Sequence, residues 1–406
     1  MSEPVAPTRD THGFRLIQVE GPPYARGLQH GRQLAPEIKL LRQRLFTDII
    51  YRQGRLMGTG FSAVLGGLLA RMHPHIPREL REEMRGVADG AGVRYRDILL
   101  FNCFDDLIHG LMQIGPALAP ILNHRFVAPV LGRLGCSSFV VPAERSHTAG
   151  PIHGRNLDYF LSDQFLDPNA IVPRTLRDHL VMLVVRPERG QPFVSVTWPG
   201  FVGVVTGMSA AHLSLACHTS TLAEERINGI ALPLLYRVAM QYAHTIDEAE
   251  WILRGGRRTI GNNVTMACGA SGEARRFELT MDDFATTRSR QDVLTCTNHF
   301  REDRLRTLQG DYAVPSSRHR LERLDELFAD GRYHANHAHA ALTDVCPRDA
   351  EQWQWDCLRN PGTIYSTVFE PADLVAWVRP HDVDERQFTR VELASLLRPN
   401  ASATAA

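Results

Sequence analysis

The residues best able to do chemistry lie in two short stretches near the middle of the chain. Gly135-Cys136-Ser137-Ser138-Phe139 predicts a small-residue turn that runs into a strand with a cysteine at its mouth. Gly154 to Tyr159 (GRNLDY) predicts the end of the return strand, and it carries Arg155 and Asp158. A cysteine attacks a carbonyl as its thiolate and needs a base within hydrogen-bond reach. The pattern therefore predicts a nucleophilic thiol at Cys136.

Two kinds of base are open to such a thiol. The first is a histidine such as His153 or His299, as in a thiol hydrolase that stays in one piece, although none of the 18 histidines stands out with a helper amide. The second is the chain's own nitrogen. If the bond before Cys136 is cut, the new α-amine has an intrinsic pKa of roughly 8 and can act as base for its own thiol. Gly135 suits such a cut, because glycine tolerates a strained turn.

Self-cleavage would pass through a thioester. The Cys136 thiol attacks the Gly135 carbonyl, the thioester hydrolyses, and Cys136 becomes a new N-terminus. An isolated cysteine is more often a small buried hydrophobe. That interpretation applies to Cys103, Cys217, Cys268, Cys296, Cys346 and Cys357.

A resemblance to a known family separates Cys136 from these. Cys136 to Phe139, followed by His153 to Tyr159, resembles the cysteine N-terminal-nucleophile (Ntn) hydrolases, which include choloylglycine hydrolases and acid ceramidase. A longer ordered set is similar to the branch typified by acyl-coenzyme A:isopenicillin N acyltransferase. Its pieces are GPPYARGLQHG from Gly21, EMRGVADGAG from Glu83, Gly135-Cys136, Phe277-Glu278, TNHF from Thr297, Arg318-His319, and Gly362-Thr363 with Val378.

The resemblance implies a role for each matched residue. Cys136 would be the nucleophile and, with Gly135, the autocleavage site. Asp158 would accept a hydrogen bond from the new amine and hold it in register with the thiol. Arg155 matches an arginine of the hydrolase branches, where a guanidinium beside the nucleophile favours the thiolate. Asn298 resembles the asparagine that donates its side-chain amide to the oxyanion, a contact worth ~10²–10³ in rate.

Three further residues are weaker candidates for substrate contacts. Arg318 fits a substrate-side arginine, and a solvated helix face explains it about as well. The family often has a Gly-x-Asn turn after the strand predicted at 201–206, whereas this chain has Gly207-Met208-Ser209. Ser209 would donate a weaker hydrogen bond in place of that asparagine, unless a backbone N–H substitutes. Asn263 is another candidate for a pocket contact.

The leading hypothesis is a self-processing enzyme that cleaves or transfers linear, non-peptide amide acyl groups through an acyl-Cys136 thioester. Water as acceptor gives an amidohydrolase, and an amine gives an acyltransferase. Arg155, at which the penicillin acyltransferase pattern differs, favours hydrolysis. Three alternatives stay open: an acyl-coenzyme A-dependent N-acyltransferase, an unprocessed thiol hydrolase and a non-catalytic homologue. Apolar surface from 107–134 and 198–205 would form an acyl pocket.

The partners implied are a small-molecule amide or acyl donor, with acyl-coenzyme A as one candidate. No cofactor or metal ion is expected. After cleavage, the chain's own two fragments would form a heterodimer.

The elements around the site change character at Cys136. Before it, helical periodicity dominates after a first strand at 14–20, and glycines within 24–31 indicate close backbone packing. After it, strands joined by hairpins alternate with blocks of helix, which favours a layered α+β fold. The resemblance makes this a four-layer αββα sandwich. We expect a single domain over 1–406 that cleaves into 1–135 and 136–406.

Composition sets broad limits. The 406 residues carry 45 Lys+Arg and 45 Asp+Glu, so no electrostatic footprint for nucleic acid is evident. Seven irregularly spaced cysteines predict no disulfide framework. No segment approaches the ~20 apolar residues of a membrane span, and the polar start of the chain lacks the apolar core of a signal peptide. We therefore expect a cytoplasmic protein without nucleic-acid or membrane partners.

Overall fold

The computed structural model describes residues 13–44, 60–118, 135–159, 176–310, 314–345, 356–381 and 387–398. The greater part of the predicted apolar segment before Gly135, residues 119–134, lies outside these ranges. The strands are β1 (Arg15–Gly21), β2 (Cys136–Val141), β3 (Ile152–Asp158), β4 (Val181–Pro187), β5 (Phe193–Thr197), β6 (Thr206–Ser209), β7 (Leu213–Thr219), β8 (Asn262–Cys268), β9 (Ala274–Leu279), β10 (Phe284–Ser289), β11 (Leu294–Cys296), β12 (Thr363–Glu370), β13 (Val375–Pro380) and β14 (Thr389–Glu392). The helices are α1 (Pro23–Gln33), α2 (Ala35–Leu41), α4 (Gly60–Met72), α5 (Arg78–Ala91), α6 (Tyr95–Asn102), α7 (Phe104–Leu118), α10 (Leu232–Tyr242), α11 (Ile246–Gly255), α12 (Asp303–Arg306), α13 (Val314–Leu327) and α14 (Ala335–Leu342).

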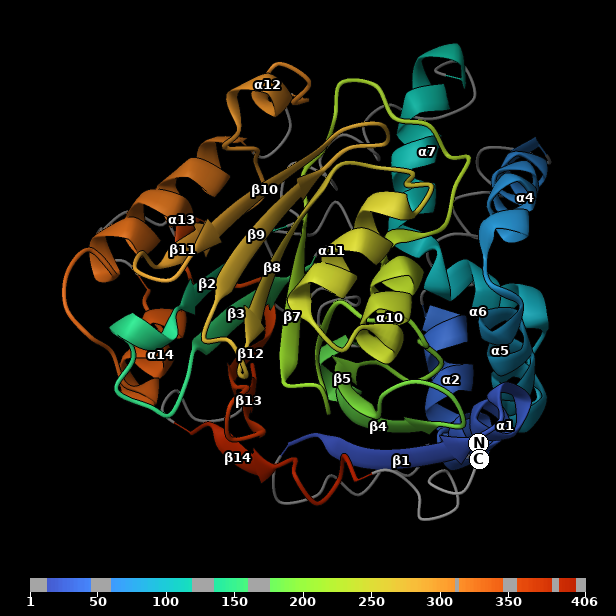
Figure 1. Cartoon of the computed structure of the whole chain (residues 1–406). Helices are drawn as coiled ribbons and strands as arrows, with labels where there is room; N and C mark the ends of the chain where they lie inside the picture. The colour runs from blue at the N-terminus through green and yellow to red at the C-terminus, as the bar shows by residue number, and fades with distance from the viewer. Residues whose placement is uncertain are drawn as a thin grey trace.

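Two sheets lie face to face in the middle of the molecule (Figure 1). The eight-stranded sheet has the order β1-β4-β5-β6-β7-β8-β9-β10, and the six-stranded sheet has the order β11-β2-β3-β12-β13-β14. Strand β2 contacts β7 and β8 across the interface. Helices α10 and α11 contact the eight-stranded sheet from outside, and α13 and α14 contact the six-stranded sheet. The predicted αββα sandwich is confirmed.

The burial of each strand follows from its place in these layers. Strands β2, β3 and β8 are buried at every residue, because a sheet covers one face and helices cover the other. The edge strands β10 and β14 keep partly exposed residues. A strand buried on both faces shows little polar alternation, which explains the weak alternation after Cys136.

The predicted hairpin around Cys136 is confirmed. Strands β2 and β3 pair antiparallel, with Cys136 opposite Leu157 and Ser138 opposite Arg155. The cysteine, the arginine and the strand-end Asp158 thus meet at one end of the six-stranded sheet.

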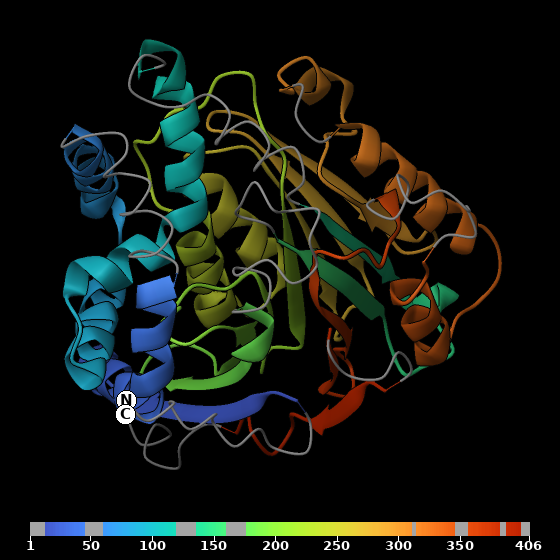
Figure 2. The same cartoon turned by 180° about the vertical axis from the view of Figure 1, so that it is seen from behind.

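The N-terminal helices pack beside the sandwich, and their glycines bring α1 against α5. An added Cβ at Gly27 would lie 2.0 Å from the Glu83 carbonyl oxygen, and one at Gly86 would lie 2.2 Å from the Tyr24 carbonyl oxygen. The predicted close backbone packing is confirmed. Seen from behind, these blue to cyan helices lie on the opposite side of the molecule from the orange α13 (Figure 2).

The segment before Gly135 makes both strand and side-chain contacts with the rest of the chain. Strand β1 pairs in parallel with β4. In addition, the buried Glu83 accepts hydrogen bonds from Arg26 at 2.7 Å and from Arg237 of α10 at 3.1 Å. Among the described helices, none combines the length and the apolar character that crossing a bilayer requires.

The prediction of a strand at 201–206 is wrong. Residues 201–205 form a loop, and β6 begins only at Thr206. The cause is Asn102 of α6, whose Oδ1 accepts from the N–H groups of Val202 and Gly203 and whose Nδ2 donates to the Gly200 carbonyl. A distant side chain thus satisfies backbone groups that a strand would pair. Consequently Ser209 lies within a strand and not in the turn that follows one.

Candidate active site

The peptide bond between Gly135 and Cys136 is held on both sides. The Cys136 N–H donates to Asn298 Oδ1 at 2.7 Å. The Gly135 carbonyl accepts from the Asp158 N–H at 2.8 Å. Any side chain at position 135 would be crowded, since an added Cβ would lie 2.9 Å from Asp158 Oδ2 and 3.5 Å from Arg320 Cζ. The cysteine itself is 9% exposed.

Arg155 places its guanidinium against the thiol. Nη2 donates to Cys136 Sγ at 3.2 Å and to the Cys217 carbonyl at 2.9 Å. Nη1 donates to the Val205 carbonyl and to Thr206 Oγ1. Within the described part of the chain, these partners include no carboxylate. Arg155 therefore brings a positive charge that no carboxylate partner neutralises into contact with Cys136 Sγ.

Asp158 ends β3 with both carboxylate oxygens engaged. Oδ1 accepts from Thr363 Oγ1 and Oδ2 accepts from Asn360 Nδ2, each at 2.7 Å. Burial raises the pKa of Asp158 to about 6, while the positive charge of Arg320 opposes that rise. A carboxyl of this kind changes its charge close to neutral pH.

Asn298 is held so that its amide oxygen faces Cys136. Its Nδ2 donates to the Thr219 carbonyl at 2.9 Å, and its own N–H donates to Ser317 Oγ at 2.7 Å. Asn263 Nδ2 donates to the carbonyls of the two residues that flank Asn298, Thr297 and His299. Asn263 therefore positions the turn that carries Asn298, and the described cavity at Cys136 does not include it.

Arg320 is the site residue that the sequence did not reveal. It is 1% exposed, and its Nη1 donates to the Cys136 carbonyl at 2.6 Å and to Ser137 Oγ at 2.9 Å. Its Nη2 donates to Asn298 Oδ1 at 3.0 Å. That amide oxygen thus accepts from two N–H donors, which fixes the orientation of the Asn298 amide.

Arg318, the arginine that the sequence favoured, points elsewhere. It is exposed on α13, two residues before Arg320, and lines a different cavity. The signal that could have separated the two is helical spacing. Ser317, Arg320 and Leu324 share the buried face of the helix, and Arg318 does not.

Ser209 is not brought to the site either. It is buried in β6, and the described residues that line the cavity at Cys136 do not include it.

Neither histidine proposed as a base lies in that cavity. His153 Nδ1 contacts Ser214 Oγ and its Nε2 contacts Thr265 Oγ1, and burial lowers the pKa of His153 to about 3. His299 contacts Ser317 Oγ, and burial together with nearby arginines lowers its pKa to about 4. Both imidazoles are committed to other contacts.

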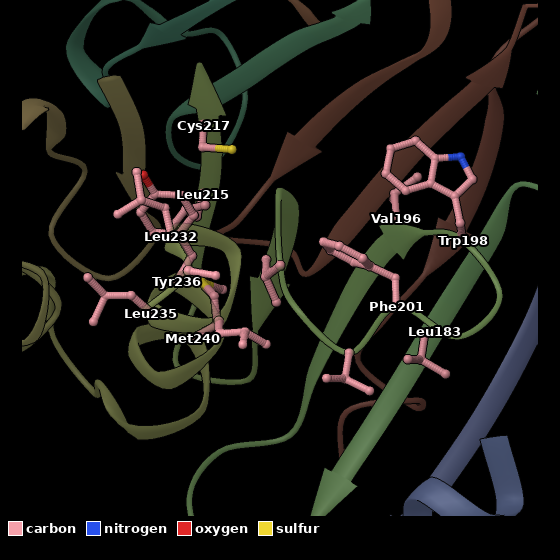
Figure 3. Close-up of a cluster of buried hydrophobic side chains, with 14 of the residues drawn as sticks. Leu183, Val196, Trp198, Phe201, Leu215, Cys217, Leu232, Leu235, Tyr236 and Met240 are labelled. Atoms are coloured by element: carbon pink, nitrogen blue, oxygen red, sulfur yellow. The ribbon is translucent and has the colours of Figure 1, made fainter. Parts of the chain in front are cut away.

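An apolar cavity of about 90 Å³ opens at Cys136. Figure 3 shows Trp198, Phe201, Cys217, Leu232 and Tyr236, side chains from three parts of the chain that all line it. The expected apolar contribution of 198–205 is thus present. The polar groups at its Cys136 end are the side chains described above.

A four-layer αββα sandwich with this arrangement around a strand-initial cysteine defines the Ntn-hydrolase class. Within that class, the family model described as acyl-coenzyme A:6-aminopenicillanic acid acyl-transferase matches residues 152–384. The chain belongs to this family. The matched range includes Arg155, Asp158, Asn298 and Arg320, and it begins after Cys136.

The individual proteins that the chain resembles share about a quarter of its residues in the aligned regions. The chain is 25% identical over 349 residues to an uncharacterized protein of Archaeoglobus fulgidus, with 79% of this chain and 55% of that protein covered. It is 25% identical over 256 residues to acid ceramidase of Mus musculus, with 61% and 54% covered. The chain thus spans about half the length of these curated relatives. Among solved structures, an N-acylethanolamine-hydrolyzing acid amidase ortholog of Caenorhabditis elegans gives a TM-score of 0.39 at 17% identity, covering 64% of this chain and 100% of that one.

Proposed function

We propose that this protein is a self-processing cysteine amidase that cuts its own Gly135–Cys136 bond and then uses Cys136 as an N-terminal nucleophile. The observation that carries the proposal is the way the reacting atoms of that bond are held. Arg155 contacts Sγ, the Asp158 N–H contacts the Gly135 carbonyl oxygen, and Asn298 accepts from the Cys136 nitrogen.

The cleavage step follows from these contacts. The thiolate attacks the Gly135 carbonyl carbon, and the developing oxyanion faces the Asp158 N–H, which is a donor of the oxyanion-hole type. The C–N bond then breaks, and the Cys136 nitrogen takes up the proton that the thiol has lost. Water hydrolyses the thioester and leaves a carboxylate on Gly135 and a free thiol on Cys136.

The two products, 1–135 and 136–406, would stay together as a heterodimer. The β1–β4 pairing and the Glu83–Arg237 contact both join the first fragment to the second. The domain therefore remains one folded unit after the cut.

In turnover, the new α-amine remains beside Asn298 Oδ1 and serves as general base for its own thiol. The thiolate attacks the substrate amide, an acyl-Cys136 thioester forms, and the amine leaves with the proton from the base. Water then releases the acid. Neither His153 nor His299 is needed, which agrees with the absence of both from the described lining of the cavity.

The substrate class follows from the cavity. Its aromatic and aliphatic lining suits the apolar acyl part of a linear amide. An amine acceptor in place of water would give acyl transfer through the same thioester, as the family's name describes.

A denaturing gel with N-terminal sequencing tests the proposal. Two fragments are expected, and the larger should begin at Cys136. Cys136→Ala should give one chain without amidase activity, whereas the control Cys268→Ala, in β8, should still be cut. An intact wild-type chain that hydrolyses amides would rule out the α-amine mechanism.

A further inference from the structure

A second cavity lies next to the turn that carries Asn298. Its lining begins at His299, the residue after Asn298, and it shares no described lining residue with the cavity at Cys136. Its volume is about 740 Å³, which falls in the range of ~300–1,000 Å³ typical of small-molecule sites. The mechanism above does not use it.

The charges in this cavity are predominantly positive. Arg301, Arg306 and Arg318 line it, and Asp303 is the one acid among its described lining residues. Burial and the surrounding arginines lower the pKa of His299 to about 4, so its imidazole is neutral at pH 7. Three positive charges and one negative charge leave a net charge of +2.

These guanidiniums have few protein partners. Arg306 pairs with Asp303 at 2.8 Å, in an exposed contact. Arg301 donates to Thr295 Oγ1 at 3.2 Å and has no ion pair within the described residues. Arg318 has neither a hydrogen bond nor an ion pair there. By comparison, Arg323 on the same helix as Arg318 contacts two carboxylates. Charged donors facing a hollow in this way are available to an anion.

The backbone around the cavity is already held in place. The buried Glu278 accepts from the N–H groups of Arg301 and Glu302 at 2.8 and 2.9 Å. The Phe300 N–H donates to Gln309 Oε1 at 2.9 Å. A ligand would therefore meet a preformed loop and not have to order it.

We propose that this cavity binds a small molecule that carries a phosphate or diphosphate group. A single carboxylate would engage one guanidinium fork, whereas a group with two or more negative charges matches the net charge of +2 and several forks at once. The group could belong to a free phosphate compound or to the nucleotide end of a larger ligand. The site is independent of whether the chain cuts itself.

Titration calorimetry of the full-length Cys136→Ala protein tests this proposal, since that variant needs no processing. Inorganic pyrophosphate and ADP are titrated at constant ionic strength, with acetate as the monoanion. We expect saturable binding of at least one of the two phosphate compounds at one site per chain, and much weaker binding of acetate. Tighter binding of ADP would indicate the nucleotide end of a larger ligand, and equal binding would indicate the phosphate groups alone.

Variants locate the binding. Arg318→Gln and Arg301→Gln should each weaken it about tenfold, because each removes a charge-assisted contact. Arg189→Gln, an exposed arginine away from the cavity, should leave the affinity unchanged. The proposal is overturned if neither pyrophosphate nor ADP saturates, if acetate binds as tightly, or if Arg318→Gln and Arg301→Gln both match the control in a folded protein.

Discussion

Replacing Arg320 by glutamine should slow self-cleavage by about two orders of magnitude. The guanidinium donates to the Cys136 carbonyl at 2.6 Å and to Asn298 Oδ1 at 3.0 Å, so it aligns both the backbone of Cys136 and the residue that holds the Cys136 nitrogen. A hydrogen bond from a charged donor is worth ~1.5–3 kcal/mol. If ~3 kcal/mol of this alignment is lost from the transition state, the rate falls about 100-fold.

The same change should alter the pH dependence of cleavage. Burial raises the pKa of Asp158 to about 6, and the charge of Arg320 opposes that rise. Without the charge, the pKa of Asp158 moves further up. The part of the pH–rate profile that reports Asp158 should therefore move to higher pH, which a merely structural role for Arg320 would not cause.

The assay is a time course of intact chain and fragments, measured between pH 5 and pH 8 on protein refolded from denaturant. Arg323→Gln is the matched control, because it removes a charge and two carboxylate contacts from the same helix without touching the site. A folded Arg320→Gln protein that cleaves at the wild-type rate with an unshifted pH profile would refute the reasoning.

Three further predictions concern separate parts of the molecule. Gly135→Ala should slow self-cleavage strongly, because the added Cβ would lie 2.9 Å from Asp158 Oδ2. Denaturing gels measure the rate, and cleavage at the normal rate would contradict this. Burial alone would lower the pKa of His109, but Glu225 and nearby aspartates raise it to about 9. A raised histidine pKa stabilises the fold below pH 6.5 and loses that effect as the pH rises through 9, so urea titrations of Cys136→Ala protein should show about 3 kcal/mol of stability lost over that window. Glu225→Gln should remove most of the dependence, and an unchanged slope would exclude the pair as its source. Gly27→Ala should lower the unfolding midpoint, because its Cβ would lie 2.0 Å from a carbonyl oxygen of α5, whereas Gly67→Ala, with nothing within 4 Å, serves as the tolerated control.

Local sequence predicted the elements whose signals are local. The β2–β3 hairpin follows from turn residues between two short β-rich runs. It pairs Arg155 with Ser138, two residues from Cys136, from where the Arg155 side chain reaches Sγ. The glycines within 24–31 predicted close packing, because only a residue without a side chain permits that approach. The layered α+β class followed from the change in period at Cys136.

Other features depend on contacts that no local pattern carries. The loop at 201–205 exists because Asn102 binds its backbone from another helix. Asn263 was expected to contact substrate, yet its amide braces the turn around Asn298. Arg318 and Arg320 are two residues apart and carry the same side chain. Which of them reaches Cys136 depends on which face of α13 packs against the sheet.

The sequence by itself determined the neighbourhood of Cys136: a glycine before a cysteine at a strand mouth, with an arginine and an aspartate on the paired strand. These residues lie within about two dozen positions of one another, and the pairing of β2 with β3 brings them close in space. The tertiary structure alone decided what surrounds that pair. Arg320 lies 184 residues after Cys136 and Asn298 lies 162 residues after it. The cavity lining comes from elements on both sides of Cys136 in the chain. Only the packing of the two sheets and their helices sets which face of each element meets the thiol.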